Sequence, residues 1–325
     1  MVQRNRRTRR EYLLVVVVLM TAGIAAAAGY QTDFQGFTSG TINNQDGWTV
    51  EDQWGNTSWG DDPAQYDQEI TDAGGGDTVW RVSNAVTSGG LSGQPFSPVA
   101  DEVAGETGSA LWNDRGPDHT NPLDPPNPNA YATTKYFYGS FDFRSVTGAA
   151  QADLAMSVSA SAKQFDGRMS YVELVDDGTN GIDVYFYETG HTTDVWGDSS
   201  DYVEIASDLS YTATHSIEIY LEFVDGLQDI GGDLYGNDIV KVLVDGTLAH
   251  TGTSWETYYK GSDPYGTGGD HAVDSLTFPL RGTFSPGNVG GGFYFENVEV
   301  SNVPEPASMS LLVLGGAMLL RRRRG

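Results

Sequence analysis

The sequence predicts an all-β fold in which two antiparallel sheets pack face to face. Apolar and polar residues alternate along many short segments, as is typical of strands with one face on a core. Between its two ends the chain has no long segment with a helical period of 3.6 residues. It also shows no fixed repeat of the kind that a solenoid would require.

The alternation is clearest in four segments, and each predicts a strand with one face on the core and one face in water. Their core-facing residues are Phe137, Gly139, Phe141 and Phe143, then Leu154, Met156 and Val158, then Ile182, Val184 and Phe186, and finally Ile217, Ile219, Leu221 and Phe223. About a dozen strands of this kind are expected along the middle of the chain.

Two local signals refine this prediction. Asp245-Gly246 between residues 239–244 and 247–250 predicts a hairpin with a two-residue type I′ turn, which needs positive φ angles. In residues 292–300 the apolar positions change parity after Phe295, which predicts a β-bulge near Glu296 and Asn297. Five prolines in residues 113–130 predict a long surface loop.

The first 28 residues, Met1–Ala28, have the pattern of a secretory signal peptide. Five arginines precede an apolar stretch over residues 12–24, and three alanines then form a cleavage site before Gly29. An uncleaved anchor is the alternative. Thr8–Leu13 also resembles a twin-arginine export motif, so both export routes stay open.

The last segment, Val303–Gly325, has three parts in a fixed order. Pro304, Glu305 and Pro306 come first, an apolar run over residues 307–320 follows, and Arg321, Arg322, Arg323 and Arg324 close the chain before Gly325. As a helix the apolar run would span about 21 Å, short of a bilayer core of about 30 Å. We expect the arginines to stay cytoplasmic, with the preceding domain outside the membrane.

This tail closely resembles the PEP-CTERM sorting signal of Gram-negative bacteria. In that family, membrane proteins called exosortases process the tail, and the substrates are associated with the cell envelope and with exopolysaccharide. The resemblance implies export to the cell surface or extracellular matrix, with transient membrane anchoring by the tail. It implies the export machinery and an exosortase as partners. A plain short tail anchor is the alternative.

The domain between the two ends, Gly29–Asn302, is strongly acidic and contains no cysteine. Without the terminal arginines, Glu11 and Glu305, it holds 9 basic and 42 acidic residues, a net charge of −33. Such a domain repels phosphate backbones and anionic lipid, so we expect no nucleic-acid partner and membrane contact only through the terminal segments. Without disulfides its stability must come from core burial.

Three stretches of this domain resemble concanavalin A-like jelly rolls of the LamG or glucanase type: Val79–Ala85, Tyr138–Arg144 and Gly290–Val298. The likeness is one of strand pattern and has no diagnostic motif. It implies a curved two-sheet antiparallel sandwich, flanked here by the signal peptide and the sorting helix. In relatives the concave face often binds or cleaves glycans, although the fold alone does not establish that function.

The sequence shows no catalytic motif. Jelly-roll glucanases carry Glu-x-Asp-x-x-Glu on one strand, and that run is absent. Glu218 and Glu222 share a strand face, but four residues separate them by about 13 Å, too far for a catalytic pair. The five histidines have no zinc-site spacing. A catalytic pair formed by carboxylates from two different strands remains an alternative. The expectation is a chain that is not an enzyme.

Clustered acids in turns offer two interpretations. Asp61 and Asp62 with Asp67 either shape turns or bind calcium, which takes six to eight oxygen ligands. Any calcium is expected at this cluster rather than at two later groups. Those groups are Asp176, Asp177 and Asp183, and then Asp225, Asp229, Asp233 and Asp238.

Aromatic residues are the candidate ligand contacts, because an exposed ring can stack on a sugar. Trp48, Trp54, Trp59 and Tyr66 form the first group, and Trp196, Trp255, Tyr258 and Tyr259 form a later one. Core packing is the alternative for each of them. The resulting prediction is a non-catalytic surface or matrix protein that binds extracellular polysaccharide. A polysaccharide-active hydrolase or lyase and a purely structural envelope component are the alternatives.

Overall fold

The computed structural model describes most of the middle domain. The described residues are 29–51, 67–86, 94–98, 136–162, 167–188, 201–222, 227–230, 233–236, 239–255, 273, 275–279 and 284–301. The predicted signal peptide, the sorting tail and the proline-rich segment 113–130 lie outside them. Within the described residues, no helix has the length and apolar character of a membrane span.

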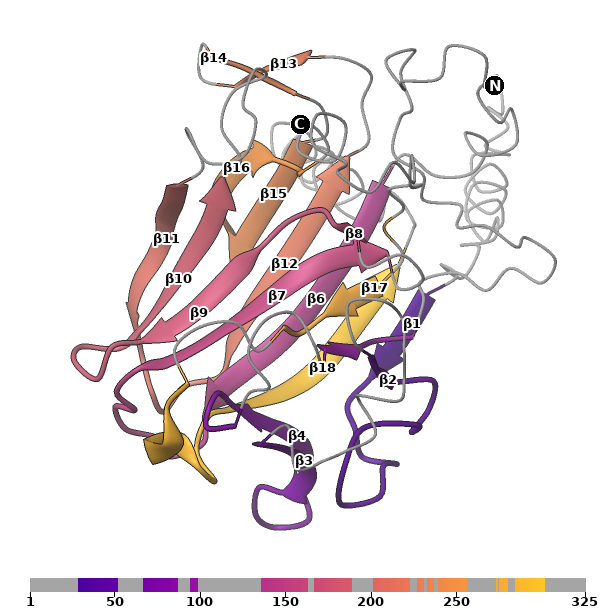
Figure 1. The fold of residues 1–325 in the computed structure, drawn as a ribbon, viewed down its shortest axis with the longest axis vertical. Helices are drawn as coiled ribbons and strands as arrows, with labels where there is room; N and C mark the ends of the chain where they lie inside the picture. The colour runs from indigo at the N-terminus through magenta and orange to yellow at the C-terminus, as the bar shows by residue number, and fades with distance from the viewer. Residues whose placement is uncertain are drawn as a thin grey trace, which may run out of the picture.

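Two antiparallel sheets form the domain, which confirms the predicted all-β, two-sheet jelly-roll sandwich. The first sheet runs β16 (Thr247–Thr253), β15 (Ile239–Val244), β12 (His215–Glu222), β6 (Tyr136–Ser145), β18 (Phe293–Ser301), β4 (Thr78–Ser83) and β3 (Asp67–Asp72), with β1 (Gly29–Thr32) paired to β18. In Figure 1 it lies behind the second sheet.

The second sheet runs β11 (Asp201–Leu209), β10 (Ile182–Glu188), β9 (Val172–Asp176), β7 (Leu154–Ala162), β17 (Ser275–Thr277), β5 (Gln94–Phe96) and β2 (Thr49–Glu51), with β8 (Gly167–Arg168) paired to β7. β13 (Leu227–Ile230) and β14 (Asp233–Gly236) form a separate hairpin, and η2 (Pro286–Asn288) is a single 3-10 turn. Several of these strands have only two to four residues, too few for a visible alternation, which is why the sequence predicts about a dozen.

The core lies between the two sheets, and the predicted core faces are confirmed. Phe137, Phe141 and Phe143 of β6 are fully buried, as are the apolar residues of β12 that lie beside them. The opposing sheet contributes the apolar face of β10, including Val184 and Phe186. Period-2 alternation therefore selects the correct face of each of these strands.

Strand β7 departs from the expected pattern. Its core-facing residues are buried as predicted, but Ser157, Ser159 and Ser161 on the other face are also buried, with at most 2% exposure. The prediction that this face lies in water is wrong. Small hydroxyl side chains fit here because they can form hydrogen bonds locally: Ser159 Oγ donates to the Ala160 carbonyl, and Ser161 Oγ bonds the carbonyl and hydroxyl of Ser159.

Both predicted irregularities are present. Asp245 and Gly246 have φ angles of 50° and 71°, as the type I′ hairpin between β15 and β16 requires. In β18 the register to β6 shifts between Glu296 and Glu299, and Asn297 adopts a φ of 47°. Asn297 Nδ2 donates to Asp142 Oδ2 at 2.7 Å, which holds the bulge against β6.

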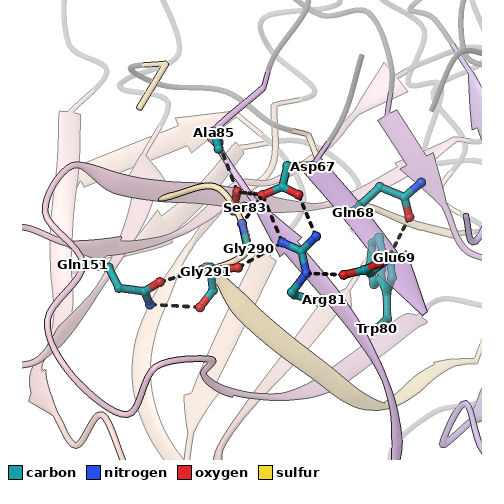
Figure 2. A network of polar contacts seen from close by, with 11 residues as sticks. Asp67, Gln68, Glu69, Trp80, Arg81, Ser83, Ala85, Gln151, Gly290 and Gly291 are labelled. Carbon is teal, nitrogen blue, oxygen red and sulfur yellow. Dashed lines mark hydrogen bonds and ion pairs between the residues drawn. The ribbon is translucent and has the colours of Figure 1, made fainter. Parts of the chain in front are cut away.

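A buried ion pair fixes the β3–β4 end of the first sheet (Figure 2). Arg81 donates from Nη2 to Asp67 Oδ1 at 2.6 Å and from Nε to Glu69 Oε1 at 3.1 Å. Asp67 Oδ2 also accepts from Ser83 Oγ at 2.6 Å and from the Gly290 N–H at 3.1 Å. The pair therefore links β3 and β4 to the segment that leads into β18.

The pKa of Asp67 reflects these contacts. Burial raises it, but the hydrogen bonds from Arg81, Ser83 and Gly290 outweigh burial and hold it below its usual value of 3.8. A depressed carboxyl pKa stabilises the fold above the unfolded value and loses that stabilisation as pH falls through the folded value.

We predict that Asp67→Asn lowers the free energy of unfolding at pH 7 by about 3 kcal/mol, because Arg81 then keeps a buried, poorly compensated charge. Glu69→Gln is the matched control. Glu69 bonds the same arginine, but 47% of its side chain is exposed, so we expect a loss below about 1 kcal/mol. Denaturant unfolding measures both, and the Asp67→Asn deficit should shrink below about pH 4. Equal losses in the two variants would contradict this assignment.

Candidate active site

The outer face of the second sheet carries an unusual concentration of tyrosines and carboxylates. In β10, Val184 and Phe186 point into the core, so Asp183, Tyr185 and Tyr187 lie on the opposite, outer face. The neighbouring strands β9 and β11 add Glu173 and Glu204 to the same face through their pairing with β10.

The strand register places these groups side by side. Tyr185 lies directly opposite Glu173 of β9 and directly opposite Glu204 of β11. Asp183 pairs with Val175, which makes it a diagonal neighbour of Glu173 at a Cα separation of about 7–8 Å. Three carboxylates therefore surround one tyrosine ring on a single face.

Two β-bulges shape the β11 edge of this group. The pairing of β10 with β11 shifts between Ile182 and Val184 and again between Val184 and Tyr185. Asp208 at the first shift has a φ of 57°, and its N–H donates to Asp183 Oδ1 at 3.0 Å. Bulges increase strand twist and re-aim side chains, and here they bring Glu204 opposite Tyr185.

Next to the carboxylates lies an aromatic cluster, defined here as Tyr171, Tyr185, Tyr187, Tyr202 and Trp255. Tyr187 is at its centre, with its ring centroid 4.6 Å from that of Tyr202 and 4.9 Å from that of Trp255. Trp255 also packs on Tyr171 at 5.0 Å. Tyr202 is 47% exposed, so the cluster is open to solvent on its β11 side.

A contact between the two sheets brings Trp255 to this face. Glu188 of β10 accepts hydrogen bonds from Thr253 N at 3.0 Å and Thr253 Oγ1 at 2.8 Å, and it contacts His250 Nε2 at 2.9 Å. These bonds hold the end of β16 against β10. The backbone N–H of Trp255 then donates to the Met169 carbonyl at 2.9 Å.

The surroundings of Asp183 on this face raise its pKa. Burial raises its pKa, the Asp208 N–H lowers it, and the charges of Glu204, Asp177 and Asp208 raise it further, with a net rise above 3.8. Burial together with Asp183 and Glu204 also raises the pKa of Tyr185, whose hydroxyl bonds Glu204. Asp183 thus holds its proton at higher pH than an ordinary aspartate, which suits a general acid.

Glycoside hydrolysis needs this kind of arrangement. One carboxyl group protonates the leaving oxygen while a second activates water, and in inverting enzymes the two groups are about 6.5–9.5 Å apart. Asp183 and Glu173 are diagonal neighbours on adjacent strands, and their Cα atoms are about 7–8 Å apart, so both carboxyl groups project from the same small area of the face. Tyrosine rings beside them offer faces on which a sugar can stack.

The outer face of the first sheet holds a second carboxylate pair. Glu218 of β12 and Glu299 of β18 both lie opposite Ser140 of β6. Burial and the charge of Glu218 raise the pKa of Glu299. Tyr138 and Tyr220 stack beside them at 4.8 Å. Two strand spacings of about 4.8 Å put the Glu218 and Glu299 Cα atoms about 10 Å apart, wider than the first pair.

The predicted ligand residues are not brought together. Trp48 is fully buried, with its ring 5.2 Å from Trp80 and its Nε1 bonded to the Tyr30 hydroxyl. Its prediction as a sugar-binding residue is therefore wrong, because its ring surface is used up in the core. Trp54, Trp59 and Tyr66 lie outside the described residues.

The predicted calcium cluster is only partly described. Asp61 and Asp62 lie outside the described residues, and both oxygens of Asp67 are engaged by Arg81. No group of three or more histidine or acidic side chains suited to a metal ion occurs in the described part of the chain. Calcium binding stays a prediction.

The sequence contains a signal for part of the candidate site. The alternation that assigns Val184 and Phe186 to the core also assigns Asp183, Tyr185 and Tyr187 to one outer face. The partners Glu173 and Glu204 come from strands whose register and bulges are not written in any local pattern. Trp255, in contrast, belongs to the later group of candidate aromatic residues.

Comparisons with known proteins identify no family for this chain. No family model matches the chain, and no curated protein matches it significantly in sequence. A solved sialidase structure is similar with a TM-score of 0.44 and 12% identity over 86% of this chain. The chain spans only 19% of that sialidase.

Two smaller proteins are similar over nearly their whole length. An alginate lyase, Aly36B, has a TM-score of 0.44 and 12% identity, covering 86% of this chain and 98% of its own. A β-glucanase of Bacillus licheniformis has a TM-score of 0.39 and 12% identity, covering 86% of this chain and all of its own. These neighbours are enzymes, which contradicts the expectation that the chain is not one.

We predict that Glu204→Gln lowers the pKa values of Asp183 and Tyr185, because it removes a negative charge that raises both. Carbon-detected NMR titration of the aspartate carboxyl groups measures the first shift. Glu218→Gln, the same charge change on the other sheet, should leave both values unchanged. An Asp183 pKa that is the same in wild type and Glu204→Gln would refute this description of the site.

Proposed function

We propose that the middle domain is a polysaccharide-active enzyme of the glycoside hydrolase class, acting on the outer face of its second sheet. The observation that carries the proposal is the placement of Asp183, Glu173 and Glu204 around Tyr185, next to the aromatic cluster. Asp183 serves as the general acid and Glu173 as the general base. Burial raises the pKa of Asp183, and the negative charge of Glu204 raises it further, so Glu204 acts on the reaction through Asp183.

The mechanism gives each carboxyl group one role. A sugar chain stacks on Tyr187 and Tyr202 with its glycosidic oxygen at Asp183, whose proton passes to that oxygen as the bond to the anomeric carbon breaks. Glu173 takes a proton from a water molecule that attacks the anomeric carbon from the opposite side. This two-sided attack predicts inversion of the anomeric configuration.

A lyase is the alternative. Elimination from a uronate needs a group that neutralises its carboxylate. Arg81, Arg144 and Lys241 lie on β4, β6 and β15 of the first sheet, and Arg168 of β8 lies in the second sheet, opposite Ser161 of β7. In the described residues, carboxylates and tyrosines dominate the outer face of the second sheet.

Export and sorting complete the proposal. The signal-peptide pattern and the PEP-CTERM resemblance support delivery of the domain to the cell surface or matrix, with processing of the tail by an exosortase. A polysaccharide of the envelope or matrix is then the accessible substrate. These terminal functions rest on the sequence pattern alone.

We predict that the full-length protein releases reducing ends from polysaccharide and that Asp183→Asn and Glu173→Gln each reduce kcat by about 10²–10⁴-fold. Glu218→Gln, on the other sheet, is the matched control and should keep full activity. Proton NMR of the first product anomer should show inversion. An unsaturated product with ultraviolet absorbance would instead establish a lyase.

The pH profile adds a separate check. Activity should fall as pH rises through the raised pKa of Asp183, because the acid then loses the proton that it donates. Glu204→Gln lowers that pKa, so the alkaline limb of kcat should move to lower pH while the protein stays folded. If the alkaline limb lies at the same pH in both proteins, Glu204 does not act on the pKa of Asp183 during catalysis. A fully active Asp183→Asn variant would overturn the proposed function.

A further inference from the structure

A glycine lets the backbone of β11 lie unusually close to the start of β10. Gly181 directly precedes β10, and Asp183 follows it two residues later. A Cβ atom on Gly181 would lie 2.5 Å and 2.6 Å from the backbone C and Cα atoms of Asp208, and 2.7 Å from the Leu209 carbonyl oxygen. Cβ atoms essentially never come this close to backbone atoms, so a larger residue here would displace β11.

The close approach places one hydrogen bond. In the first bulge of this strand pair, Ser207 and Asp208 of β11 both lie opposite Asp183. Asp208 adopts a φ of 57° there, and its N–H donates to Asp183 Oδ1 at 3.0 Å. The hydrogen bond therefore depends on the position of the β11 backbone, which Gly181 permits.

Tyr211, two residues beyond β11, ties the turn that carries Gly181 to that strand. Its hydroxyl donates to the Gly181 carbonyl and to Asp176 Oδ1, each at 3.1 Å. Asp176 is fully buried and also accepts from the Gln151 N–H at 2.6 Å and the Gly178 N–H at 2.9 Å. These bonds hold Gly181 at a fixed distance from the bulge.

The hydrogen bond to Oδ1 decides which oxygen of a protonated Asp183 carries the hydrogen. In a neutral carboxyl group one oxygen carries the hydrogen and the other keeps its acceptor capacity. Because the Asp208 N–H donates to Oδ1, Oδ1 takes the acceptor role and the hydrogen lies on Oδ2. A general acid must present its proton to the leaving oxygen, so this assignment bears directly on the reaction.

We propose that Gly181 and Asp208 are positioning residues for the general acid: Gly181 admits the β11 backbone, and the Asp208 N–H holds Oδ1 of Asp183 so that Oδ2 delivers the proton. The inference rests on the proposed function, since it concerns the same carboxyl group. Neither residue has to touch the sugar, because both act through the orientation of Asp183.

The charged and titratable groups that face Asp183 come from its own strand, from both neighbouring strands and from the adjoining turn. They are Tyr185 of β10, Glu173 of β9, Glu204 and Asp208 of β11, and Asp177 of the turn. Burial and the charges of Glu204, Asp177 and Asp208 raise the pKa of Asp183, whereas the Asp208 N–H lowers it because it stabilises the ionised form. The backbone and the side chain of Asp208 thus act in opposite directions.

Two substitutions in the full-length protein separate these effects. Gly181→Ala should displace β11, break the bond from Asp208 to Asp183 and raise the pKa of Asp183. Asp208→Asn keeps the N–H, because asparagine tolerates positive φ, and removes a charge, so it should lower that pKa. Gly36→Ala serves as the control, since a Cβ there meets no described atom within 4 Å, and it should leave the pKa unchanged. Carbon-detected NMR titration of the aspartate carboxyl groups measures all three.

Kinetics give a second measurement. In Gly181→Ala, kcat should fall by about 10–100-fold with KM near the wild-type value, because a misplacement of about 1 Å can cost about 10²-fold. The alkaline limb of kcat should move to higher pH in Gly181→Ala and to lower pH in Asp208→Asn. A merely structural role would lower stability without moving the two limbs apart.

A measurement on the wild type keeps the test independent of folding of the variants and of turnover. The amide proton of Asp208 should move downfield as Asp183 ionises, with the same midpoint as the Asp183 carboxyl group. An Asp208 amide that does not follow this titration, or an unchanged Asp183 pKa in folded Gly181→Ala, would overturn the inference and leave the hydrolase proposal intact. The expected shifts in a protein that cleaves no polysaccharide would support the arrangement around Asp183 and overturn the hydrolase proposal alone.

Discussion

Aromatic packing between the two sheets is the contact on which the rest of the domain depends. Trp80 lies at its centre, with ring centroids 5.2 Å from Trp48, 4.9 Å from Phe278 and 5.5 Å from Phe295. The chain has no cysteine, so no disulfide shares this task. Because these rings come from both sheets, each sheet gives one face to the core, and the two outer faces are left for other purposes.

The two outer faces differ in how their charged side chains are arranged. On the first sheet, Arg81 forms a nearly buried ion pair with Asp67, and Arg144 forms a partly exposed pair with Glu296, which is a structural use of charge. The second sheet keeps Asp183, Glu173 and Glu204 around a tyrosine and adds an aromatic cluster beside them. The bulges of β11 disturb a regular ladder at this place, as is common next to functional sites.

Sequence alternation was sufficient for the fold class and for the inner faces of β6, β10 and β12, because burial of one face imposes a period of two. The hairpin at Asp245-Gly246 was also predictable, since few residues adopt positive φ twice in succession. The site was not. Glu173 and Glu204 meet Tyr185 only through strand register, and Trp48 has the local sequence of an exposed loop residue although its ring completes the core.

Chemical-shift mapping of a bound neutral oligosaccharide tests the central claim most directly. Amide spectra of full-length Asp183→Asn, which should bind without cleavage, are recorded during titration. The account predicts that the largest changes fall on β9, β10 and β11, around Glu173, Tyr185 and Glu204. Changes confined to β6, β12 and β18, around Tyr138 and Glu218, would place the site on the other sheet and contradict the account.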